Sequence, residues 1–462
     1  MGDRKGRQVR RRTSNREAEV KLRGPGAKAD SPVAGSVIEN PMFGTDLMEV
    51  TCGRDNLLAA LRRVRSNKGS PGTDGMTVDE LPAYLKTHWP AIKDALLKGD
   101  YVPQPVRRVE IPKPGKKEKR KLGIPCVLDR FIQQALLQVL QSRWDGTFSE
   151  HSYGFRPGRS AHQAIAKAQS YLTSGHSFVV DLDLEAFFDR VNHDRLMSRL
   201  AQQIGDKRVL KLIRAYLQAG ILEDGLIKSP TEGTPQGGPL SPFLSNVVLD
   251  ELDKELERRG HTFVRYGDDC NVYVKSRRAG ERIMASLRGF ITTRLKLKVN
   301  EAKSAVDAPQ QRKFLGFTFT AGRSPNRRKI APESLRRFRA HVRQLTRRNG
   351  SISLEERIRR LRAYLLGWRG YFGYCETGSV LRDLDSWIRH RLRCVQWKQW
   401  KVYGRRKAEL IRLGVTPDLA QTTAWSAKGP WRISHTPGVR MALNNGYFDA
   451  LGLPRLEPRA SI

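Results

Sequence analysis

The sequence predicts an α/β region over residues 46–328 and an all-α region that begins at residue 329. Two apolar runs in the first region, residues 178–183 and 263–275, have the length and composition of strands, and segments with helical periodicity lie between them. From residue 329 onwards, apolar residues recur at helical spacing in segments crowded with Arg, Tyr and Trp. The hydrophobic content of 39% is sufficient for packed cores in a chain of 462 residues.

The first elements of the α/β region are expected to be a helix, a loop and a hairpin. Apolar residues recur at helical spacing from residue 56, and the Gly- and Pro-containing residues 69–75 then predict a loop. Residues 106–125 contain two apolar arms around a basic turn, which predicts a hairpin. A helix over residues 131–140 follows it.

Strands are expected at three later positions. Residues 178–183 form an apolar run that ends in acidic residues, which suits a buried strand. Residues 263–275 alternate around Gly267-Asp268-Asp269, which predicts two short strands joined by a tight turn that carries the acids. Residues 314–319 predict another strand.

The all-α region, residues 329–401, is expected to contain helices over residues 334–348, 354–374 and 380–400. The tail, residues 402–462, combines short helical pieces with loops that contain Pro and Gly. At the other end, residues 1–45 are basic and rich in Gly, Ser and Pro, which predicts a disordered arm. Such an arm either touches nucleic acid or is a solvated tail without a role.

The charge of the chain indicates a polyanionic partner. Lys and Arg total 84 against 47 acidic residues, which gives a formal net charge of +37. Nucleic acid is the leading candidate, because cations that neutralise phosphates release condensed counterions. A peripheral membrane protein is the alternative, although no apolar run approaches the roughly 18 residues that a membrane span requires.

The cysteines indicate a reducing compartment. They are scattered and form no CxxC pair, which argues against a disulfide framework and against a zinc ribbon. The basic N-terminus also lacks the apolar segment of a secretory leader. We therefore expect a cytoplasmic protein that is associated with nucleic acid.

Carboxylates at separate positions are placed to hold metal ions. Asp183 lies at the end of the strand expected at residues 178–183, and Asp268 and Asp269 lie in the expected turn. Adjacent acids in an apolar stretch are unfavourable unless a positive group neutralises them, and Mg²⁺ prefers carboxylate oxygens. Two divalent ions held by such carboxylates are what the joining of nucleotides requires. A solvent-facing Asp-Asp turn is the alternative, and Asp181 is a rival to Asp183.

Several ordered blocks of the sequence resemble one protein family. The block at residues 178–193 resembles the first catalytic motif of reverse transcriptases, and residues 263–274 resemble their YxDD motif. Between them, residues 233–242 resemble the PQG block. Further blocks match at residues 122–125, 149–158 and 312–317. Together these blocks make the chain similar to the group II intron-encoded reverse transcriptase/maturase family, of the endonuclease-less bacterial type.

The resemblance implies a right-hand polymerase, with α/β fingers and palm over residues 46–328 and an all-α thumb, or maturase domain X, over residues 329–401. It implies an RNA-directed DNA polymerase that copies group II intron RNA by target-primed reverse transcription and assists intron splicing as a maturase. The partners are then intron RNA, an RNA template/DNA primer duplex, deoxynucleoside triphosphates and target DNA. Residues 402–462 resemble a short DNA-binding tail, and an HNH nuclease is not expected because no cysteine follows Cys394.

Two other functions remain open. One is a splicing maturase with an idle polymerase site, although degenerate sites usually lose the acids that this chain retains. The other is a reverse transcriptase that has been domesticated by its host or serves phage defence. The maturase-like block argues against the second alternative.

By position in the matching motifs, the catalytic and metal-binding residues are Asp183, Asp268 and Asp269. The resemblance implies that they hold two Mg²⁺ ions, with Mn²⁺ as a substitute. Asp183 is preferred to Asp181 because its spacing to Phe188 matches the aspartate-to-aromatic spacing of the family.

The motif residues that precede the acids are Tyr266 and Gly267. The family often has Ala in place of Gly267. Both residues are small, so the turn is expected to survive, and this departure does not put activity in doubt.

The residues assigned to nucleotide binding are Lys113, Arg120, Phe188, Gln236, Gly237 and Lys303. The basic hairpin with Lys113 and Arg120 would bind the triphosphate, or else it is a solvated loop. Phe188 would exclude a 2′-hydroxyl by its bulk, or else it packs in the core. Gln236 and Gly237 would approach the nucleotide and template closely. Lys303 is a candidate proton donor to pyrophosphate.

The expected helices of the all-α region interleave aromatic residues with arginines. Aromatic faces stack on bases and Arg pairs with phosphates, and the resemblance to the maturase domain implies RNA binding. At helical spacing, Trp368, Tyr371 and Trp387 are expected mainly to pack the helices. The arginines expected to face RNA are Arg362, Arg369, Arg389, Arg391 and Arg393.

Overall fold

The structure is a computed structural model that describes residues 43–112, 119–223, 226–228, 232–234 and 237–457. Lys113 and Gln236 lie outside the described residues, as does most of the arm expected at residues 1–45. The last part of that arm is folded, since Phe43 is buried and its ring packs against Trp144 at a centroid distance of 5.5 Å.

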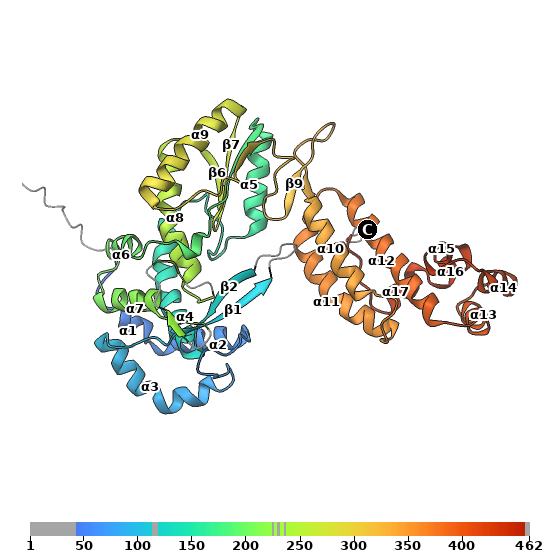
Figure 1. The fold of residues 1–462 in the computed structure, drawn as a ribbon, viewed down its shortest axis with the longest axis horizontal. Coiled ribbons are helices and arrows are strands. Elements are labelled where there is room, and N and C mark those ends of the chain that lie inside the picture. Colours follow the sequence, from blue (N-terminus) through green and yellow to red (C-terminus); the bar gives the residue numbers. More distant parts are fainter. Residues whose placement is uncertain (1–42, 113–118, 224–225, 229–231, 235–236, 458–462) are drawn as a thin grey trace, which may run out of the picture. The chain divides into compact units, whose positions relative to one another are not determined.

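The elements follow one another in three groups (Figure 1). The first group comprises α1 (Leu47–Thr51), α2 (Arg54–Ser66), α3 (Leu81–Lys98), β1 (Val106–Pro112), β2 (Lys119–Ile124) and α4 (Val127–Trp144). The second comprises α5 (Ala161–Thr173), β3 (Phe178–Leu182), α6 (His193–Ala201), α7 (Lys207–Gln218), β4 (Ile221–Glu223), β5 (Leu226–Lys228), α8 (Ser241–Arg258), β6 (Thr262–Tyr266), β7 (Asp269–Val274), α9 (Arg277–Phe290), β8 (Ala305–Asp307), β9 (Phe317–Phe319) and β10 (Arg328–Ile330). The third comprises α10 (Pro332–Leu345), α11 (Leu354–Phe372), α12 (Gly378–Gln399), α13 (Tyr403–Arg412), α14 (Pro417–Trp425), α15 (Pro430–Ile433), α16 (Pro437–Ala442) and α17 (Asn445–Ala450).

The hairpin expected at residues 106–125 is confirmed. Its strands β1 and β2 pair antiparallel, with Val109 opposite Leu122. β4 and β5 extend the sheet, whose order is β2-β1-β4-β5. Arg120 stands opposite Ile111, near the free end of the hairpin.

The apolar runs that precede and contain the acids are adjacent strands of another sheet, in the order β6-β7-β3-β8. Neighbouring strands of this sheet are antiparallel, and Leu182 at the end of β3 stands opposite Cys270 in β7. Asp183 therefore follows β3 at the sheet edge where the turn with Asp268 and Asp269 lies.

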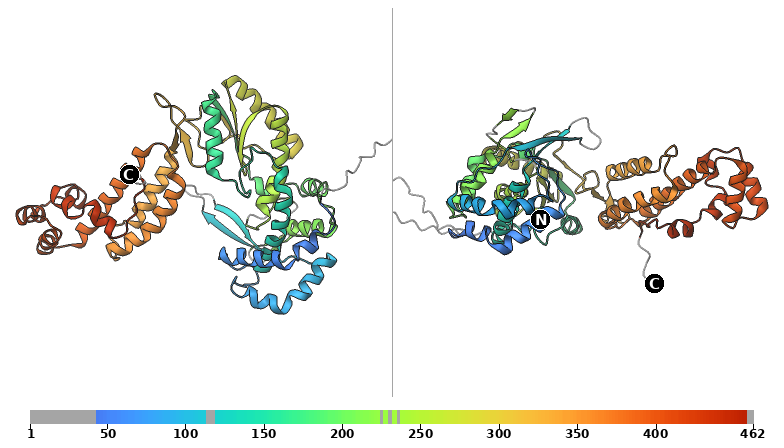
Figure 2. Two further views of the ribbon diagram at one scale, coloured as in Figure 1. Left: turned by 180° about the vertical axis from the view of Figure 1, so that it is seen from behind. Right: turned by 90° about the horizontal axis from the view of Figure 1, so that it is seen from below.

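Helices cover both faces of this sheet, and the alternation of side chains along its strands assigns the two cores. On one face, Val180 and Val272 belong to a core that includes residues of α9. Gly280 of α9 lies so close to the sheet that a Cβ atom added to it would come within 3.4 Å of valine side chains. On the other face, Val179 and Tyr273 pack with apolar residues of α5. Figures 1 and 2 show β6 and β7 between these two helices.

The strand expected at residues 314–319 is shorter in the structure, because only its last part forms β9. Phe314 and Phe317 exchange backbone hydrogen bonds of 2.9 Å, which closes a tight turn. Leu315 and Gly316 within that turn have φ angles of +51° and +83°. The apolar residues of the turn gave it the appearance of a strand.

The helices expected after residue 329 are confirmed as α10, α11 and α12, with somewhat different ends. One apolar core joins them to the C-terminal helices and contains the buried Trp397 and Phe448. Trp368 packs in this core as expected, and Tyr371 and Trp387 are half-buried. Across the described residues, we find no helix with the length and apolar content that crossing a membrane requires.

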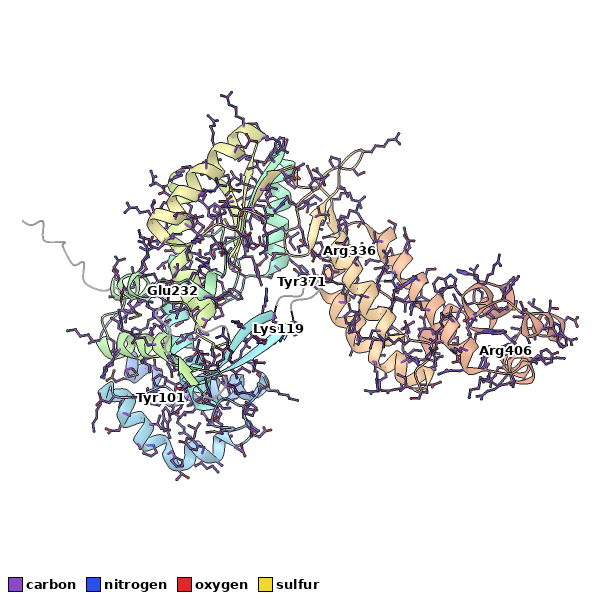
Figure 3. The ribbon with its side chains drawn as sticks, viewed as in Figure 1. Tyr101, Lys119, Glu232, Arg336, Tyr371 and Arg406 are labelled. Carbon is purple, nitrogen blue, oxygen red and sulfur yellow. The ribbon has the colours of Figure 1, made fainter. Side chains whose placement is uncertain are left out.

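One buried acid of the N-terminal core gives the fold a pH dependence. Asp129 of α4 is only 1% exposed. Its Oδ1 accepts a hydrogen bond from Tyr101 Oη at 2.9 Å, and its Oδ2 accepts one from Gln104 N at 3.1 Å. Tyr101 is labelled in Figure 3. Burial raises the pKa of Asp129 to about 6, although these hydrogen bonds act in the opposite direction.

We expect replacement of Asp129 by Asn to remove this pH dependence. The unfolded chain has an Asp pKa of about 3.9, so the folded state binds the proton more tightly. The resulting stabilisation is complete below about pH 4, is lost as the pH rises through about 6, and amounts to about 3 kcal/mol. Urea denaturation at several pH values measures it. Between about pH 4 and pH 7 the free energy of unfolding of the wild type should fall by this amount relative to that of Asp129→Asn. A constant difference would contradict the prediction.

Candidate active site

The acidic turn between β6 and β7 consists of Gly267 and Asp268, flanked by the paired residues Tyr266 and Asp269. Gly267 has a φ angle of +66°, in the left-handed region that strains residues with a side chain. A Cβ atom at this position would lie 2.9 Å from the ring of Phe155. Alanine would therefore be strained in this turn, so the two small residues are not equivalent here.

The candidate metal-binding carboxylates line one open pocket of about 600 Å³. Asp183 enters it from the end of β3, and Asp268 and Asp269 enter it from the turn. The other charged residues that line the pocket are Arg120, Asp181, Lys303, Arg312 and Lys313. Folding thus brings together acids that the sequence separates by more than eighty positions, and it surrounds them with cations.

The carboxylates in this pocket repel one another. Burial raises the pKa of Asp269 well above its usual value, and nearby Asp181, Asp268 and Asp183 raise it further. Loss of hydration beside neighbouring protein atoms is the larger cause that raises the pKa of Asp268, and the charge of Asp183 is the smaller one. The side chain of Asp268 still reaches solvent. Among the described residues, neither Asp268 nor Asp269 forms an ion pair. A bound cation would relieve this repulsion.

Asp183 and Asp181 differ in what neutralises them. Asp181 is tied to Arg312, whose Nε and one terminal nitrogen donate to its Oδ2 at 2.8 and 2.6 Å. Asp183 is half-exposed, and it accepts hydrogen bonds from Lys303 Nζ at 3.0 and 3.1 Å. A flexible lysine is displaced more easily than an arginine bound through two nitrogens. The geometry therefore favours Asp183 over Asp181 as the acid that is open to a ligand.

The backbone around Asp183 is held in place by residues 300–304. Asn300 N donates to Asp183 O at 2.8 Å, and Asp183 N donates to Ser304 Oγ at 3.0 Å. The same segment carries Lys303 to the pocket. One short loop thus holds the backbone of Asp183 in place and also supplies the positive charge that neutralises its carboxylate.

The chemistry of the donors suits a hard divalent cation. Carboxylate oxygens are the ligands that Mg²⁺ prefers. Burial and then neighbouring carboxylates raise the pKa values of Asp268 and Asp269, so a cation beside them would favour their ionised forms. Over the part of the chain that the structure describes, no three such side chains are already gathered closely enough to enclose a metal ion. Lys303 pairs with Asp183 instead.

Arg120 and Lys303, two of the residues assigned to the nucleotide, line the carboxylate pocket. Phe188 is half-buried and lines a separate cavity of about 210 Å³, together with Gly123 of β2. Its backbone O accepts a hydrogen bond from Thr234 N at 2.6 Å. The structure thus places Arg120 and Lys303 in the carboxylate pocket, but it does not place Phe188 there.

Gly237 has a structural reason to be glycine. Its φ angle is +139°, and an added Cβ would lie 2.5 Å from Gly123 O of β2. The backbone at Gly237 therefore lies close to the hairpin that carries Arg120. An approach of Gly237 to the nucleotide and template stays a prediction.

The arginines expected to face RNA have partners within the chain. Each donates to a carbonyl, hydroxyl or carboxylate of another segment, and Arg389 is almost fully buried. The pairs are Arg362 with Gly452, Arg369 with Arg455, Arg389 with Asp449, Arg391 with Thr346 and Arg393 with Leu443. These contacts fasten neighbouring segments to α11 and α12. RNA binding by these residues stays a prediction, and their visible role is packing.

The exposed arginines of α10 are a further basic group, outside the residues expected to face RNA. Arg336, which is labelled in Figure 3, is one of them, and the others on or just beyond the helix are Arg337, Arg339, Arg343, Arg347 and Arg348. The acid of this helix, Glu333, pairs with Lys313 and Arg337. Positions 339, 343 and 347 are spaced for one helical face. That spacing was a signal available in the sequence.

Comparisons with known families divide the chain in the same way as its secondary structure. Residues 111–319 match the family described as reverse transcriptase (RNA-dependent DNA polymerase). Residues 335–413 match the group II intron, maturase-specific domain. The carboxylate pocket lies in the first match, and α10, α11 and α12 lie largely in the second.

Several curated proteins are similar to this chain. The chain is 36% identical over 290 residues to Protein YkfC of Escherichia coli (strain K12), which covers 54% of this chain and 76% of that protein. It is 29% identical over 370 residues to the group II intron-encoded protein LtrA of Lactococcus lactis subsp. cremoris, which covers 66% of this chain and 60% of LtrA. It is 30% identical over 270 residues to the putative COX1/OXI3 intron 1 protein of Saccharomyces cerevisiae, which covers 56% of this chain and 31% of that protein. The chain belongs to the reverse transcriptases that carry a group II intron maturase domain, and it is an RNA-directed DNA polymerase.

Proposed function

We propose that the chain copies group II intron RNA by target-primed reverse transcription and assists the splicing of the same RNA. The observation that carries this proposal is the maturase-specific match at residues 335–413, directly after the polymerase region. The partners are intron RNA, the RNA template/DNA primer duplex, deoxynucleoside triphosphates and target DNA. The protein acts in the bacterial cytoplasm, bound to nucleic acid.

Reverse transcriptases generally use divalent metal ions, and we assign two Mg²⁺ ions, with Mn²⁺ as a substitute, to Asp183, Asp268 and Asp269. When bound, such ions activate the primer 3′-hydroxyl and stabilise the charge that develops on the phosphates. The contribution of the chain is a set of carboxylates fixed by strand ends. The raised pKa of Asp269, which comes first from burial and then from the neighbouring acids, supports the assignment.

Lys303 then has two successive partners. Without metal it neutralises Asp183 through its ammonium group. Once that charge is compensated otherwise, the ammonium is free to donate a proton to the leaving pyrophosphate. The position of Lys303 in the carboxylate pocket supports this role.

The remaining nucleotide contacts are assigned by motif and by position. Arg120 binds the triphosphate, because it lines the carboxylate pocket and its charge acts on Asp268. Phe188 excludes a 2′-hydroxyl by its bulk, a role that rests on its motif. Lys113 and Gln236 are assigned by their motifs alone.

One experiment tests the proposal and separates it from its rivals. The purified protein is incubated with Mg²⁺, a DNA primer and a panel of bacterial group II intron precursor RNAs, and both cDNA and spliced RNA are quantified. We expect at least one intron RNA to be copied and also to splice faster than it does alone. Faster splicing without cDNA would indicate a maturase with an idle polymerase site. Copying without faster splicing of any RNA would indicate a domesticated or defence reverse transcriptase.

A further inference from the structure

A fully buried arginine lies directly beneath the acidic turn. Arg265 in β6 is 0% exposed and precedes Gly267 by two residues. Its side chain makes an ion pair with Asp253 of α8, with Nε and one terminal nitrogen donating to the two carboxylate oxygens at 2.7 and 2.5 Å. Asp253 is also 0% exposed. Both charges are therefore satisfied inside the protein.

The remaining hydrogen bonds of Arg265 connect the turn to its surroundings. One terminal nitrogen donates to Gly267 O at 2.9 Å and to Asn246 Oδ1 at 2.9 Å. The other terminal nitrogen also donates to Ser152 Oγ at 2.8 Å. A single guanidinium thus joins the turn, α8 and the segment of residues 149–154.

The same segment also touches the turn through its backbone. Tyr153 N donates to Arg265 O at 2.9 Å, and Asn246 Nδ2 donates to Gly154 O at 2.8 Å. A Cβ added to Gly154 would lie 2.3 Å from Gly267 N, so the two backbones are in close contact. The turn, Arg265, Asn246 and the segment of residues 149–154 are therefore joined to one another by hydrogen bonds and close backbone contact.

Energetics suggest that this arrangement serves geometry. A buried ion pair is seldom more stabilising than apolar residues of similar volume, because both ions lose their hydration. Arginine offers what an apolar residue or a lysine lacks, a planar fork that directs several donors in fixed directions. One of those directions ends at the carbonyl of Gly267, the residue immediately before the first acid of the turn.

We propose that Arg265 is a positioning residue of the polymerase. By holding the Gly267 carbonyl, it fixes the turn so that Asp268 and Asp269 face Asp183 across the pocket. It acts through the backbone and touches neither substrate nor metal. The inference rests on the proposed role of these carboxylates, so its test includes a measurement on the metal-free protein.

The central variant is Arg265→Lys, which keeps the positive charge for Asp253 but loses the fork. A second variant, Asn246→Ala, removes a neighbour of the guanidinium while the ion pair stays intact, which guards against failure of the first to fold. The matched control is Arg208→Lys. Arg208 also uses its fork to join two acids, Glu49 and Asp206, but it lies in α7 and does not contact the turn.

Three measurements are made on each variant well below its melting temperature. They are hydrogen exchange of the amides of residues 263–271 without metal, binding of Mn²⁺ followed by electron paramagnetic resonance, and the kcat and KM for a deoxynucleoside triphosphate. We expect Arg265→Lys to speed exchange in the turn, to weaken Mn²⁺ binding and to lower kcat by about 10²-fold with little change in KM. Asn246→Ala should act in the same direction, but less. Arg208→Lys should match the wild type in all three measurements.

If exchange in the turn, Mn²⁺ binding and kcat of both variants follow the control, Arg265 serves stability alone and the proposal is overturned. If exchange in the turn speeds up but Mn²⁺ does not bind even to the wild type, positioning is supported and the metal assignment fails instead. The hydrogen-exchange measurement thus separates the two ideas.

Discussion

Replacement of Asp269 by Asn is expected to slow nucleotide addition by about 10³-fold or more while the fold stays as stable as before or becomes more stable. Activity falls because an amide removes negative charge and a strong ligand from a site that supplies several kcal/mol to the transition state. Stability moves the other way, because burial and the neighbouring acids raise the pKa of Asp269 in the folded protein. Its ionised form therefore opposes folding at neutral pH, and Asn removes that penalty.

Single-nucleotide primer extension on an RNA template and thermal unfolding at neutral pH measure the two effects. The control is Asp307→Asn, a change of the same kind in β8 of the same sheet. Asp307 is partly exposed and pairs with Arg277, so its loss should leave extension near the wild-type rate. Extension by Asp269→Asn within about tenfold of wild type would refute the metal assignment. A lower melting temperature for this variant would refute the electrostatic explanation.

The parts of the site that the sequence could predict are those that depend on local pattern. The apolar run before Asp183 and the alternation around Gly267 indicated three strands and a turn, and the sheet contains the strands as β3, β6 and β7. The convergence of the acids followed from motif order. The period of 2 residues in strands and of 3.6 residues in helices is visible in short stretches of sequence, so it can be recognised without knowledge of the tertiary fold.

The parts that could not be predicted depend on pairs of residues far apart in the sequence. Arg389 was expected to face RNA, but its partner Asp449 lies 60 positions away and the pair is packed between helices. Arg389 also pairs with Asp385 four residues earlier, but this spacing does not reveal burial, because the same pairs occur on exposed helix faces. The same holds for Gly237, whose close neighbour is the backbone of Gly123, and for Arg265, whose position beneath the turn needs α8. Burial of charge is a tertiary property, and only exposed helical stripes such as that of α10 can be read locally.

The stripe on α10 leads to the second large expected effect. Simultaneous replacement of Arg339, Arg343 and Arg347 by Gln should weaken binding of intron RNA by about 10²-fold at moderate salt. The three side chains are exposed and, within the described residues, form no ion pair. Arg339 and Arg343 lie about one helical turn apart on α10, and Arg347 follows the end of that helix. Their charges are therefore available to phosphates, whereas those of Arg389 and Arg391 are engaged within the chain.

Salt dependence makes this prediction specific. If each arginine neutralises one phosphate, the slope of log affinity against log salt should become less steep by about 2 for single-stranded RNA and by nearly 3 for a duplex. The matched control replaces Arg359, Arg360 and Arg412 by Gln. These arginines are also exposed and carry the same total charge, but each is already paired with an acid, Arg359 and Arg360 with Glu356 and Arg412 with Glu409. If only net charge mattered, both triple variants would lose the same affinity. A change of slope confined to the α10 variant would instead locate the phosphate contacts on that helix, and an unchanged slope in that variant would exclude them.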